Sequence, residues 1–236
     1  MVSASSPSPE FALGQASLFD PEALAIVLVG TALATFARTG WQGIGNALPW
    51  LVRFARSGFD EPANRTALAR WVRAVRKSGI LGADAPFPPD AALSRALDGL
   101  VRSGSLAMFH MLHDAARKER VEQHKRAAQV FEQAGELAPV FGLVGTLFAM
   151  TQLAPGTGED ASAAAFGAIA SAVLSSLYGV LTANLVCFPI AGAIMRRSAR
   201  EEHARGKLVN WVADEIADVL PSARADAAIA KLQPAA

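Results

Sequence analysis

Residues 161–195, ASAAAFGAIASAVLSSLYGVLTANLVCFPIAGAIM, contain no Asp, Glu, Lys, Arg or His, and this stretch decides the fold. A helix crosses the hydrocarbon of a membrane with about 20 apolar residues. These 35 uncharged residues exceed one crossing, so we expect the helix to tilt or to project beyond the hydrocarbon. A second uncharged run, residues 137–158, has 22 residues, and only Glu159 and Asp160 separate the two runs. The two runs predict a membrane hairpin whose ends lie on the same side.

The basic residues are confined to two parts of the chain. The totals hide this, because 22 Lys and Arg stand against 21 Asp and Glu, a net charge of +1. No base lies in residues 1–37, fifteen lie in 38–138, none in 139–195 and seven in 196–236. Since basic loops stay on the cytoplasmic side of a membrane, the two basic parts are predicted to be cytoplasmic. The acidic turn and the N-terminus are then predicted to be periplasmic.

The composition excludes several classes of protein. Hydrophobic residues make up 52% of the chain and charged residues 18%, which excludes a disordered chain. The near-neutral balance excludes a chain built to coat nucleic acid. The single cysteine, Cys187, excludes an intrachain disulfide framework and a cysteine-cluster metal site. We therefore expect membrane lipid, and no nucleic acid, among the partners.

A third candidate span lies near the N-terminus. Residues 23–37 carry no charge, Asp20 can cap a helix, and Pro21 and Glu22 suit its first turn. At 15 residues this run also fits a buried core helix, so both interpretations stay open. Residues 1–19 have neither the basic nor the apolar region of a cleavable signal peptide, and we expect a loose tail there.

Together these features predict an all-α, multi-pass membrane protein with three transmembrane helices and a helical cytoplasmic domain. The predicted parts are an N-terminal tail (1–19), transmembrane helix 1 (20–38), a cytoplasmic domain (39–138), transmembrane helix 2 (139–155), a periplasmic turn (156–161), transmembrane helix 3 (162–195) and a cytoplasmic C-terminal helix and tail (196–236). Within the cytoplasmic domain, helices are expected over 66–77, 91–102 and 106–135. The last of these has no break signal before the second span. The apolar positions that predict the first are Leu68, Trp71, Val72 and Val75.

Two polar features of this domain allow more than one interpretation. The basic residues of the 66–77 helix are Arg70, Arg73, Arg76 and Lys77. They fit lipid headgroups, nucleic acid or an acidic protein, and equally a solvated helix face. His110, His113 and His124 would need a further ligand, placed by the fold, to hold a metal. We expect a polar helix surface at these histidines and no metal site.

The sequence carries no signature of an enzyme. It has no phosphate-binding loop, no G-x-S-x-G elbow and no H-E-x-x-H helix, so neither catalysis nor a cofactor is expected. The spans carry hydroxyls instead. These are Ser171, Ser175, Tyr178 and Thr182 on one helix face, Ser176 beside them, and Thr146 in the other hairpin span. Such hydroxyls line a polar path or bond to neighbouring helices and to their own helix carbonyls, and both interpretations stay open.

Ion relays inside a membrane usually rely on an ionisable side chain. The three uncharged runs contain no Asp, Glu, Lys, Arg or His. If this chain conducts ions, a titrating carboxylate must come from another subunit, which favours a heteromer.

Two segments resemble a known family. Residues 137–147 (LAPVFGLVGTL) and 172–191 (AVLSSLYGVLTANLVCFPIA) are similar to the last two spans of the MotA/PomA flagellar stator subunits, within the MotA/TolQ/ExbB channel superfamily. Residues 20–27 (DPEALAIV) resemble the second stator span, and 75–84 (VRKSGILGAD) resemble the rotor-contact stretch. The resemblance implies an ion-channel A subunit of the bacterial inner membrane that couples proton or sodium flow to torque.

The resemblance also assigns roles to single residues. Thr146 and Ser176 match hydroxyls that face the ion path, and Ser175 of the hydroxyl stripe is placed with them. Pro139 and Pro189 match prolines that couple ion flow to a change of shape. The residues on rotor-contact positions are Arg76, Lys77 and Asp84. Asp84 stands where the family usually has Glu, and Ser176 stands where sodium-driven members have Thr, which leaves the ion open.

The partners implied by the resemblance are a MotB/PomB-like single-span, peptidoglycan-binding subunit, the rotor protein of the flagellar switch, and further copies of this chain in a pentamer. One departure concerns the spans, because stator subunits have four and only three are predicted here. Three spans with a periplasmic N-terminus is the arrangement of TolQ and ExbB. The motifs favour the stator. A TolQ/ExbB-like energiser of outer-membrane transport or integrity, and a non-conducting membrane scaffold, remain alternatives.

Overall fold

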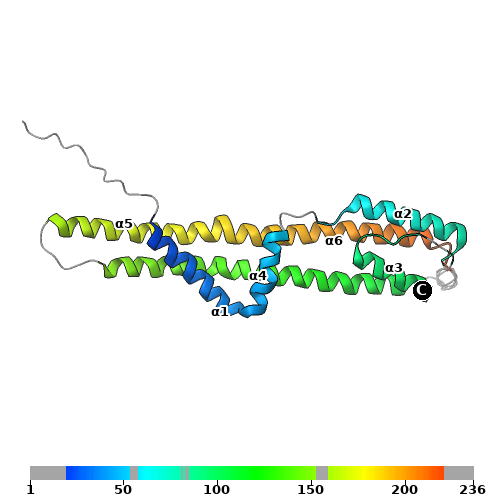
Figure 1. Cartoon of the computed structure of the whole chain (residues 1–236), viewed down its shortest axis with the longest axis horizontal. Helices are drawn as coiled ribbons and strands as arrows, with labels where there is room; N and C mark the ends of the chain where they lie inside the picture. Colours follow the sequence, from blue (N-terminus) through cyan, green and yellow to red (C-terminus); the bar gives the residue numbers. More distant parts are fainter. Residues whose placement is uncertain (1–19, 54–57, 81, 83–84, 153–158, 221–236) are drawn as a thin grey trace, which may run out of the picture. The chain divides into compact units, whose positions relative to one another are not determined.

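The structure, a computed structural model, describes residues 20–53, 58–80, 82, 85–152 and 159–220. Within these ranges it contains helices and turns but no strand, which confirms the all-α prediction. The helices are α1 (Pro21–Arg53), α2 (Glu61–Ser78), α3 (Ala91–Ser103), α4 (Leu106–Thr151), α5 (Glu159–Leu181), the π-helix η1 (Thr182–Cys187) and α6 (Phe188–Ile216) (Figure 1). In this described part, three helical stretches are long and apolar enough to cross a membrane: Pro21–Trp41, Leu106–Thr151 and Ala164–Ile216.

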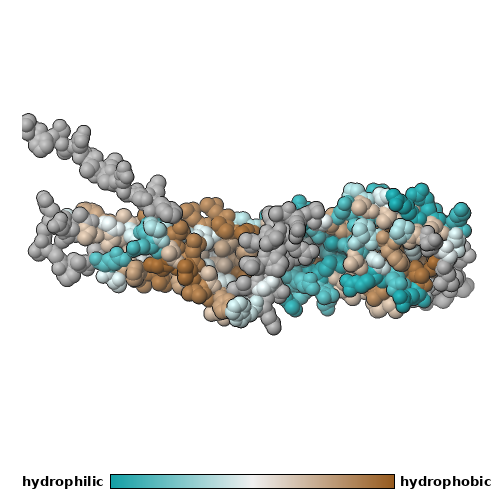
Figure 2. Space-filling view, in the orientation of Figure 1, coloured by the Kyte–Doolittle hydropathy of each residue, from teal (hydrophilic) through white to brown (hydrophobic). Residues whose placement is uncertain are grey.

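The chain divides into two units. The first comprises the residues up to Trp41 and Val130–Ile190, and the second comprises Gln42–Gln129 and the residues from Ala191 onward. In the first unit, apolar surface gathers over α1 and α5, whereas the surface over α2 in the second unit is mainly polar (Figure 2). Each unit is therefore described by itself.

In the first unit, α1 buries one face and then breaks. Its buried residues Ala23, Val27, Thr31 and Thr35 recur every four positions, which places them on a single side of the helix. At Gly40 the backbone takes φ 66° and ψ −178°, so α1 consists of two helical pieces that meet there. A positive φ of this size is readily adopted only by glycine.

Helices α4 and α5 lie side by side with their backbones nearly in contact (Figure 1). A Cβ atom added to Gly179 would lie 2.7 Å from the carbonyl oxygen of Ala138 and 3.1 Å from the Cα of Gly142. A Cβ at Gly145 would overlap the side chain of Ser175. Glycine is thus required at these positions by space. In lipid, where no hydrophobic force draws helices together, such close contact contributes much of the association.

The second unit has a conventional apolar core. Helices α2, α3 and α6 and the start of α4 contribute side chains that are almost fully buried, led in size by Trp71, Phe109, Leu68, Leu93, Leu97, Leu100 and Ile216. The predicted 66–77 helix is confirmed, because α2 buries the four apolar residues expected from their spacing. The Oδ1 atoms of Asp60 and Asp90 cap α2 and α3 by accepting backbone N–H groups of the first turns.

The predicted connection between α4 and the second span is also confirmed. Helix α4 runs from Leu106 to Thr151 with Pro139 inside it. Helix α5 begins at Glu159, so the two acidic residues expected in the turn are helical. The rest of that turn, residues 153–158, and the predicted tail 1–19 lie outside the described residues.

Candidate functional site

One of the three hydroxyls predicted for the ion path, that of Ser175, bonds across the contact between α4 and α5. Ser175 is fully buried, and its Oγ donates to the carbonyl oxygen of Gly142 at 3.0 Å. Thr146 Oγ1 donates to the carbonyl oxygen of Leu143 on its own helix at 2.7 Å. Ser176 is half-buried and forms no such bond among the described residues. Two of these hydroxyls therefore have structural roles. Ser175 bonds a neighbouring helix, and Thr146 bonds a carbonyl of its own helix.

A carboxylate joins this row of hydroxyls, which the sequence did not predict. Asp20 Oδ1 accepts the backbone N–H groups of Glu22 at 3.0 Å and Ala23 at 3.1 Å, which confirms the predicted cap of α1. Its Oδ2 accepts the hydroxyl of Ser171, and its backbone N–H donates to the Tyr178 hydroxyl at 3.0 Å. The capping residue of the first candidate span is thus bonded to two members of the hydroxyl stripe on α5.

Pro139 lies at the close contact between α4 and α5. Having no N–H, it leaves the carbonyl of Gly135 without its usual helical partner. Its Cα would lie 3.1 Å from a Cβ at Gly179 on α5. A change of bend at this proline would therefore repack the glycine contact between the two helices.

Pro189 is the second residue after the π-helix η1, which ends at Cys187. The backbone N–H of Phe188 donates to the carbonyl of Ala183, five residues back, instead of four as in an α-helix. This wider turn stands where a proline ring would otherwise press on the preceding turn. Phe188 also reaches α4, because a Cβ at Gly135 would lie 2.8 Å from its ring. Within the first unit, Pro139 therefore lies at a contact between α4 and α5, and Pro189 lies next to a contact between α4 and the start of α6.

In the second unit, two of the three residues predicted for rotor contact, Arg76 and Lys77, lie at the end of α2. Arg76 Nε and Nη2 donate to the backbone oxygen of Glu215 at 3.1 and 2.9 Å, and Nη2 lies 3.5 Å from its carboxylate. Arg76 therefore fastens the end of α2 to the last turn of α6. Lys77 is exposed and makes no ion pair within the described ranges. The third predicted contact, Asp84, lies outside the described residues.

A buried ion network links α4, α6 and the start of α3. Arg120 makes two bonds to the Glu202 carboxylate, at 2.7 and 2.8 Å. Arg205 bonds the same carboxylate at 2.9 Å and reaches Asp90 Oδ2 at 3.0 Å. Its guanidinium also lies 4.4 Å from the centre of the Phe59 ring. No pattern in the sequence indicates this network, because Asp90 and Arg205 are 115 positions apart.

The network shifts the protonation of its members. Burial alone would raise the pKa of Glu202, but its bond with Arg120 and the charges of Arg120 and Arg205 hold the pKa below its ordinary value. Burial, together with the nearby Arg120 charge, lowers the pKa of His113. Glu202 is therefore held ionised and His113 neutral at pH 7.

The expectation that the histidines form a polar helix surface is wrong for two of the three. His113 is 4% exposed and His124 is 6% exposed, because the face of α4 that carries them is covered within the second unit. His113 Nδ1 has no hydrogen-bond partner in the described part of the chain. Among those same residues, no three His, Cys, Asp or Glu side chains come together to hold a metal.

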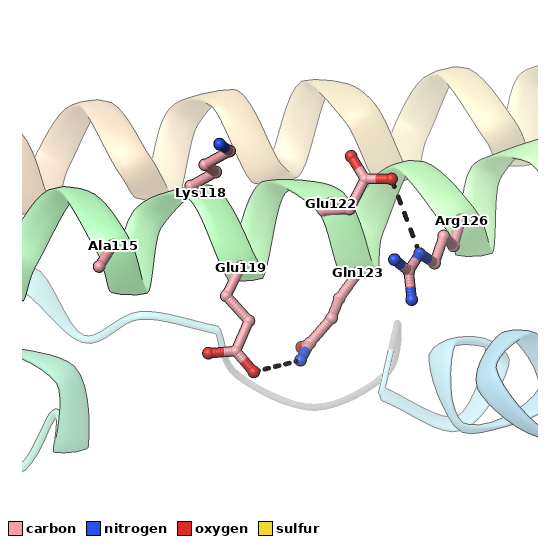
Figure 3. Close-up of a pocket in the computed structure, with 6 residues that line it drawn as sticks. All are labelled: Ala115, Lys118, Glu119, Glu122, Gln123 and Arg126. Carbon is pink, nitrogen blue, oxygen red and sulfur yellow. Dashed lines mark hydrogen bonds and ion pairs between the residues drawn. The ribbon is translucent and has the colours of Figure 1, made fainter.

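A pocket of about 640 Å³ lies along one exposed face of α4 (Figure 3). Its lining residues are Ala115, Lys118, Glu119, Glu122, Gln123 and Arg126. Gln123 Nε2 donates to Glu119 Oε1 at 3.4 Å, and Arg126 Nε lies 3.6 Å from Glu122 Oε1. These groups bond along their own helix and converge on no common point, so the pocket lacks the geometry of a catalytic site.

A match to a protein-family model identifies the family of this chain. The model of the MotA/TolQ/ExbB proton channel family matches residues 86–207, just over half of the 236 residues. The chain belongs to the MotA/TolQ/ExbB proton channel family. The resemblance inferred from the hairpin sequences is thereby confirmed. Its membership and its three apolar helical stretches make it a multi-pass protein of the inner membrane, from a family of channels.

Relatives within the MotA/TolQ/ExbB family include flagellar proteins. The chemotaxis protein PomA of Vibrio alginolyticus is 28% identical over 156 residues, which is 65% of this chain and 60% of PomA. Motility protein A of Bacillus subtilis is 24% identical over 204 residues, 83% of this chain and 73% of that protein. The chain thus spans well under the full length of PomA.

A solved structure shares the fold. A chain of the flagellar MotAB stator complex from Bacillus subtilis superposes with a TM-score of 0.71 at 21% identity, covering 85% of this chain and 80% of that chain. The similarity establishes that the helical architecture described above is that of a MotAB stator chain.

Proposed function

We propose that this chain is the ion-channel A subunit of a flagellar-stator-like rotary motor. It couples proton or sodium flow to torque, together with a MotB/PomB-like single-span subunit anchored to peptidoglycan. The observation that carries the proposal is the α4–α5 contact, which combines close glycine backbones, the interhelical bond of Ser175 and the neighbouring Pro139. Family membership and the similarity to PomA and to motility protein A support it.

The division of labour follows from the charges. Residues 139–195 contain Glu159 and Asp160 but no acid within the two hairpin spans. The carboxylate that takes the ion is therefore supplied by the B subunit. Five copies of this chain surround two copies of that subunit, and the hydroxyls at Thr146 and Ser176 face the path between them. Ser175, also predicted for this path, is fully buried and bonds α4 instead. Pro139 and Pro189 convert ion passage into a change of helix bend.

The membrane arrangement is proposed from the same charges. Residues 20–38, 139–155 and 162–195 span the membrane, with the N-terminus in the periplasm and both basic parts in the cytoplasm. The end of α2, with Arg76 and Lys77, then faces the rotor protein of the flagellar switch, and Asp84, which follows in the sequence, is proposed to contact the same protein.

Ion flux tests the channel. The chain is reconstituted in vesicles with its B-type partner, and proton and sodium uptake are measured under an imposed gradient. Flux that needs both subunits and is lost when the partner's acidic residue is neutralised supports the proposal. A non-conducting scaffold predicts no flux with any partner.

Motility tests the torque. Lys77→Glu reverses an exposed charge without touching the α2–α6 contact, and it should impair swimming while membrane assembly persists. Arg76→Glu is a weaker test, because it also removes the bonds to Glu215. Unimpaired swimming in Lys77→Glu would count against a rotor contact.

A second candidate, a TolQ/ExbB-like energiser of outer-membrane transport or integrity, is favoured by one observation. The described residues hold three helical stretches of spanning length, the number that the resemblance implies for TolQ and ExbB. Deletion of the gene separates the candidates. Loss of swimming alone supports the stator, and loss of outer-membrane uptake or integrity with swimming intact supports the energiser.

A further inference from the structure

A pocket in the second unit lies beside the first charged residues that follow the uncharged run 161–195. Its volume is about 430 Å³. It is lined by Gly58, Phe59, Ala193, Arg196, Arg197, Arg200 and Glu201. Arg196 comes directly after Met195, the last of 35 uncharged residues. The pocket thus combines three guanidinium groups, one carboxylate and the apolar surface of Phe59 and Ala193.

The single carboxylate is already engaged. Glu201 bonds Arg197 at 3.0 Å and lies 3.5 Å from Arg205. The chain packs closely here, because a Cβ at Gly58 would overlap the Glu201 carboxylate and lie 2.6 Å from Arg197 Nη2. The negative charge of Glu201 is therefore shared between two arginines and is not available to the others.

Arg196 and Arg200 carry the uncompensated charge of the pocket. Both are exposed, and within the described ranges neither forms an ion pair. Arg200 Nε donates to the backbone oxygen of Arg196 at 3.4 Å, and the guanidinium of Arg196 lies over Gly192. Two guanidinium groups one helical turn apart suit a phosphate group, whose oxygens accept paired N–H bonds.

We propose that this pocket binds the phosphate of an anionic phospholipid in the cytoplasmic leaflet, held by Arg196 and Arg200. The proposal rests on the membrane spans proposed above, because they place residue 195 at the cytoplasmic boundary. Basic pockets at the cytoplasmic end of membrane helices bind acidic headgroups. The apolar wall favours a lipid over a free phosphate ion, since the glycerol and upper acyl atoms can cover Phe59 and Ala193.

The test measures lipid retention by the full chain. The protein is purified from membranes, equilibrated with mixed micelles that hold phosphatidylglycerol and phosphatidylcholine in equal amounts, and weighed with its bound lipids by native mass spectrometry. Arg196→Gln with Arg200→Gln should reduce the affinity for phosphatidylglycerol by about fivefold per charge, about 25-fold in all, at about 1 kcal/mol per arginine. Phosphatidylcholine retention should not change.

Three companion variants separate a pocket from diffuse charge. Arg70→Gln with Arg73→Gln removes two exposed arginines of α2 and should leave retention unchanged. Arg196→Lys with Arg200→Lys keeps the charge and should restore most of the binding. Ala193→Phe fills the pocket without changing charge and should also reduce retention. Retention that ignores Ala193→Phe, or that falls equally in the α2 variant, overturns the proposed pocket.

Two further measurements distinguish failure of the lipid assignment from failure of the proposed membrane spans. Displacement of phosphatidylglycerol by millimolar inorganic phosphate would show a site for free anions and overturn the lipid assignment. Extraction of the chain from membranes at alkaline pH would instead overturn the proposed spans, on which the site depends. In a third outcome, the wild type and the Arg196→Gln/Arg200→Gln variant both resist extraction and retain phosphatidylglycerol equally. That result overturns the lipid site and leaves the proposed spans standing.

Discussion

The two units of this chain are held together in opposite ways. In the first, Gly142, Gly145 and Gly179 let α4 and α5 approach until backbone meets backbone, with a single buried hydroxyl bond between Ser175 and Gly142. In the second, large side chains such as Trp71 and Phe109 fill a core, and a buried ion network lies beside it.

The difference fits the solvent that we propose for each unit, lipid for the first and water for the second. In water, removing apolar area stabilises a core by about 25 cal/mol per Å², so large side chains are favoured. In lipid that gain disappears, and close packing and hydrogen bonds remain. The same chain therefore selects small residues in one unit and bulky ones in the other.

The largest expected effect is a loss of stability in the second unit. Glu202→Gln removes the buried charge that pairs with the half-buried Arg120 and with the buried Arg205, and Arg120 then loses its partner on α6. Breaking a buried pair typically costs about 3–5 kcal/mol, so the free energy of unfolding should fall by that order. Denaturant unfolding followed by the fluorescence of Trp71 and Trp211 measures it. The control is Asp98→Asn, whose exposed pair with Arg102 at 2.9 Å should contribute less than about 1 kcal/mol. Equal losses in the two variants would contradict the role given to the network.

The next largest effect is a loss of packing between α4 and α5 in the first unit. Gly179→Leu places a side chain against the backbone of α4, and overpacking of this kind costs about 1–3 kcal/mol. Hydrogen exchange of the backbone in residues 137–149 should accelerate, because the helices must separate. Gly167→Leu is the matched control, since no described atom lies within 4 Å of a Cβ there. If Gly167→Leu accelerates exchange as much as Gly179→Leu, the close contact is not what holds α4 and α5 together.

A smaller effect distinguishes two neighbouring hydroxyls of α5, those of Ser175 and Ser176. Ser175→Ala removes the bond to Gly142, and interhelical bonds in membranes average about 0.6 kcal/mol. We expect Ser175→Ala to lower stability by that order, and Ser176→Ala to lower ion flux while stability is kept. Thermal unfolding in detergent and flux in vesicles measure the two quantities. Flux that survives Ser176→Ala would move the ion path away from this residue.

The smallest effect is a dependence of stability on pH. Burial lowers the pKa of His113 below its ordinary value of 6.5. The unfolded chain therefore binds the proton more readily, and stability falls as the pH drops below about 6.5. Glu202, whose pKa lies below its ordinary 4.5, loses its contribution only at still lower pH.

Thermal unfolding between pH 7.5 and 5.5 isolates the histidine. The midpoint of the wild type should fall across this range, and His113→Leu should flatten the fall. His203→Leu, at an exposed position of α6, should keep the wild-type slope. A wild-type slope in His113→Leu would show that another group titrates.

Much of the fold could be predicted because its signals are local. Uncharged runs mark the candidate spans, and the spacing of Leu68, Trp71, Val72 and Val75 predicted the buried face of α2. Asp20 was correctly predicted as the cap of α1, since a cap acts within its own first turn. The histidines were misjudged because a heavily charged helix hides which of its faces is covered.

The sequence by itself determined the helices, the candidate spans and the family, since charge placement, periodicity and motif are read along one chain. Only the tertiary structure decided which groups share a site. The bond of Asp20 to Ser171 joins residues 151 positions apart, and the bond of Arg120 to Glu202 joins residues 82 positions apart. Such pairs leave no periodic mark in the sequence, because distance through space is set by how the helices pack. The π-turn before Pro189 likewise depends on backbone geometry that composition does not record.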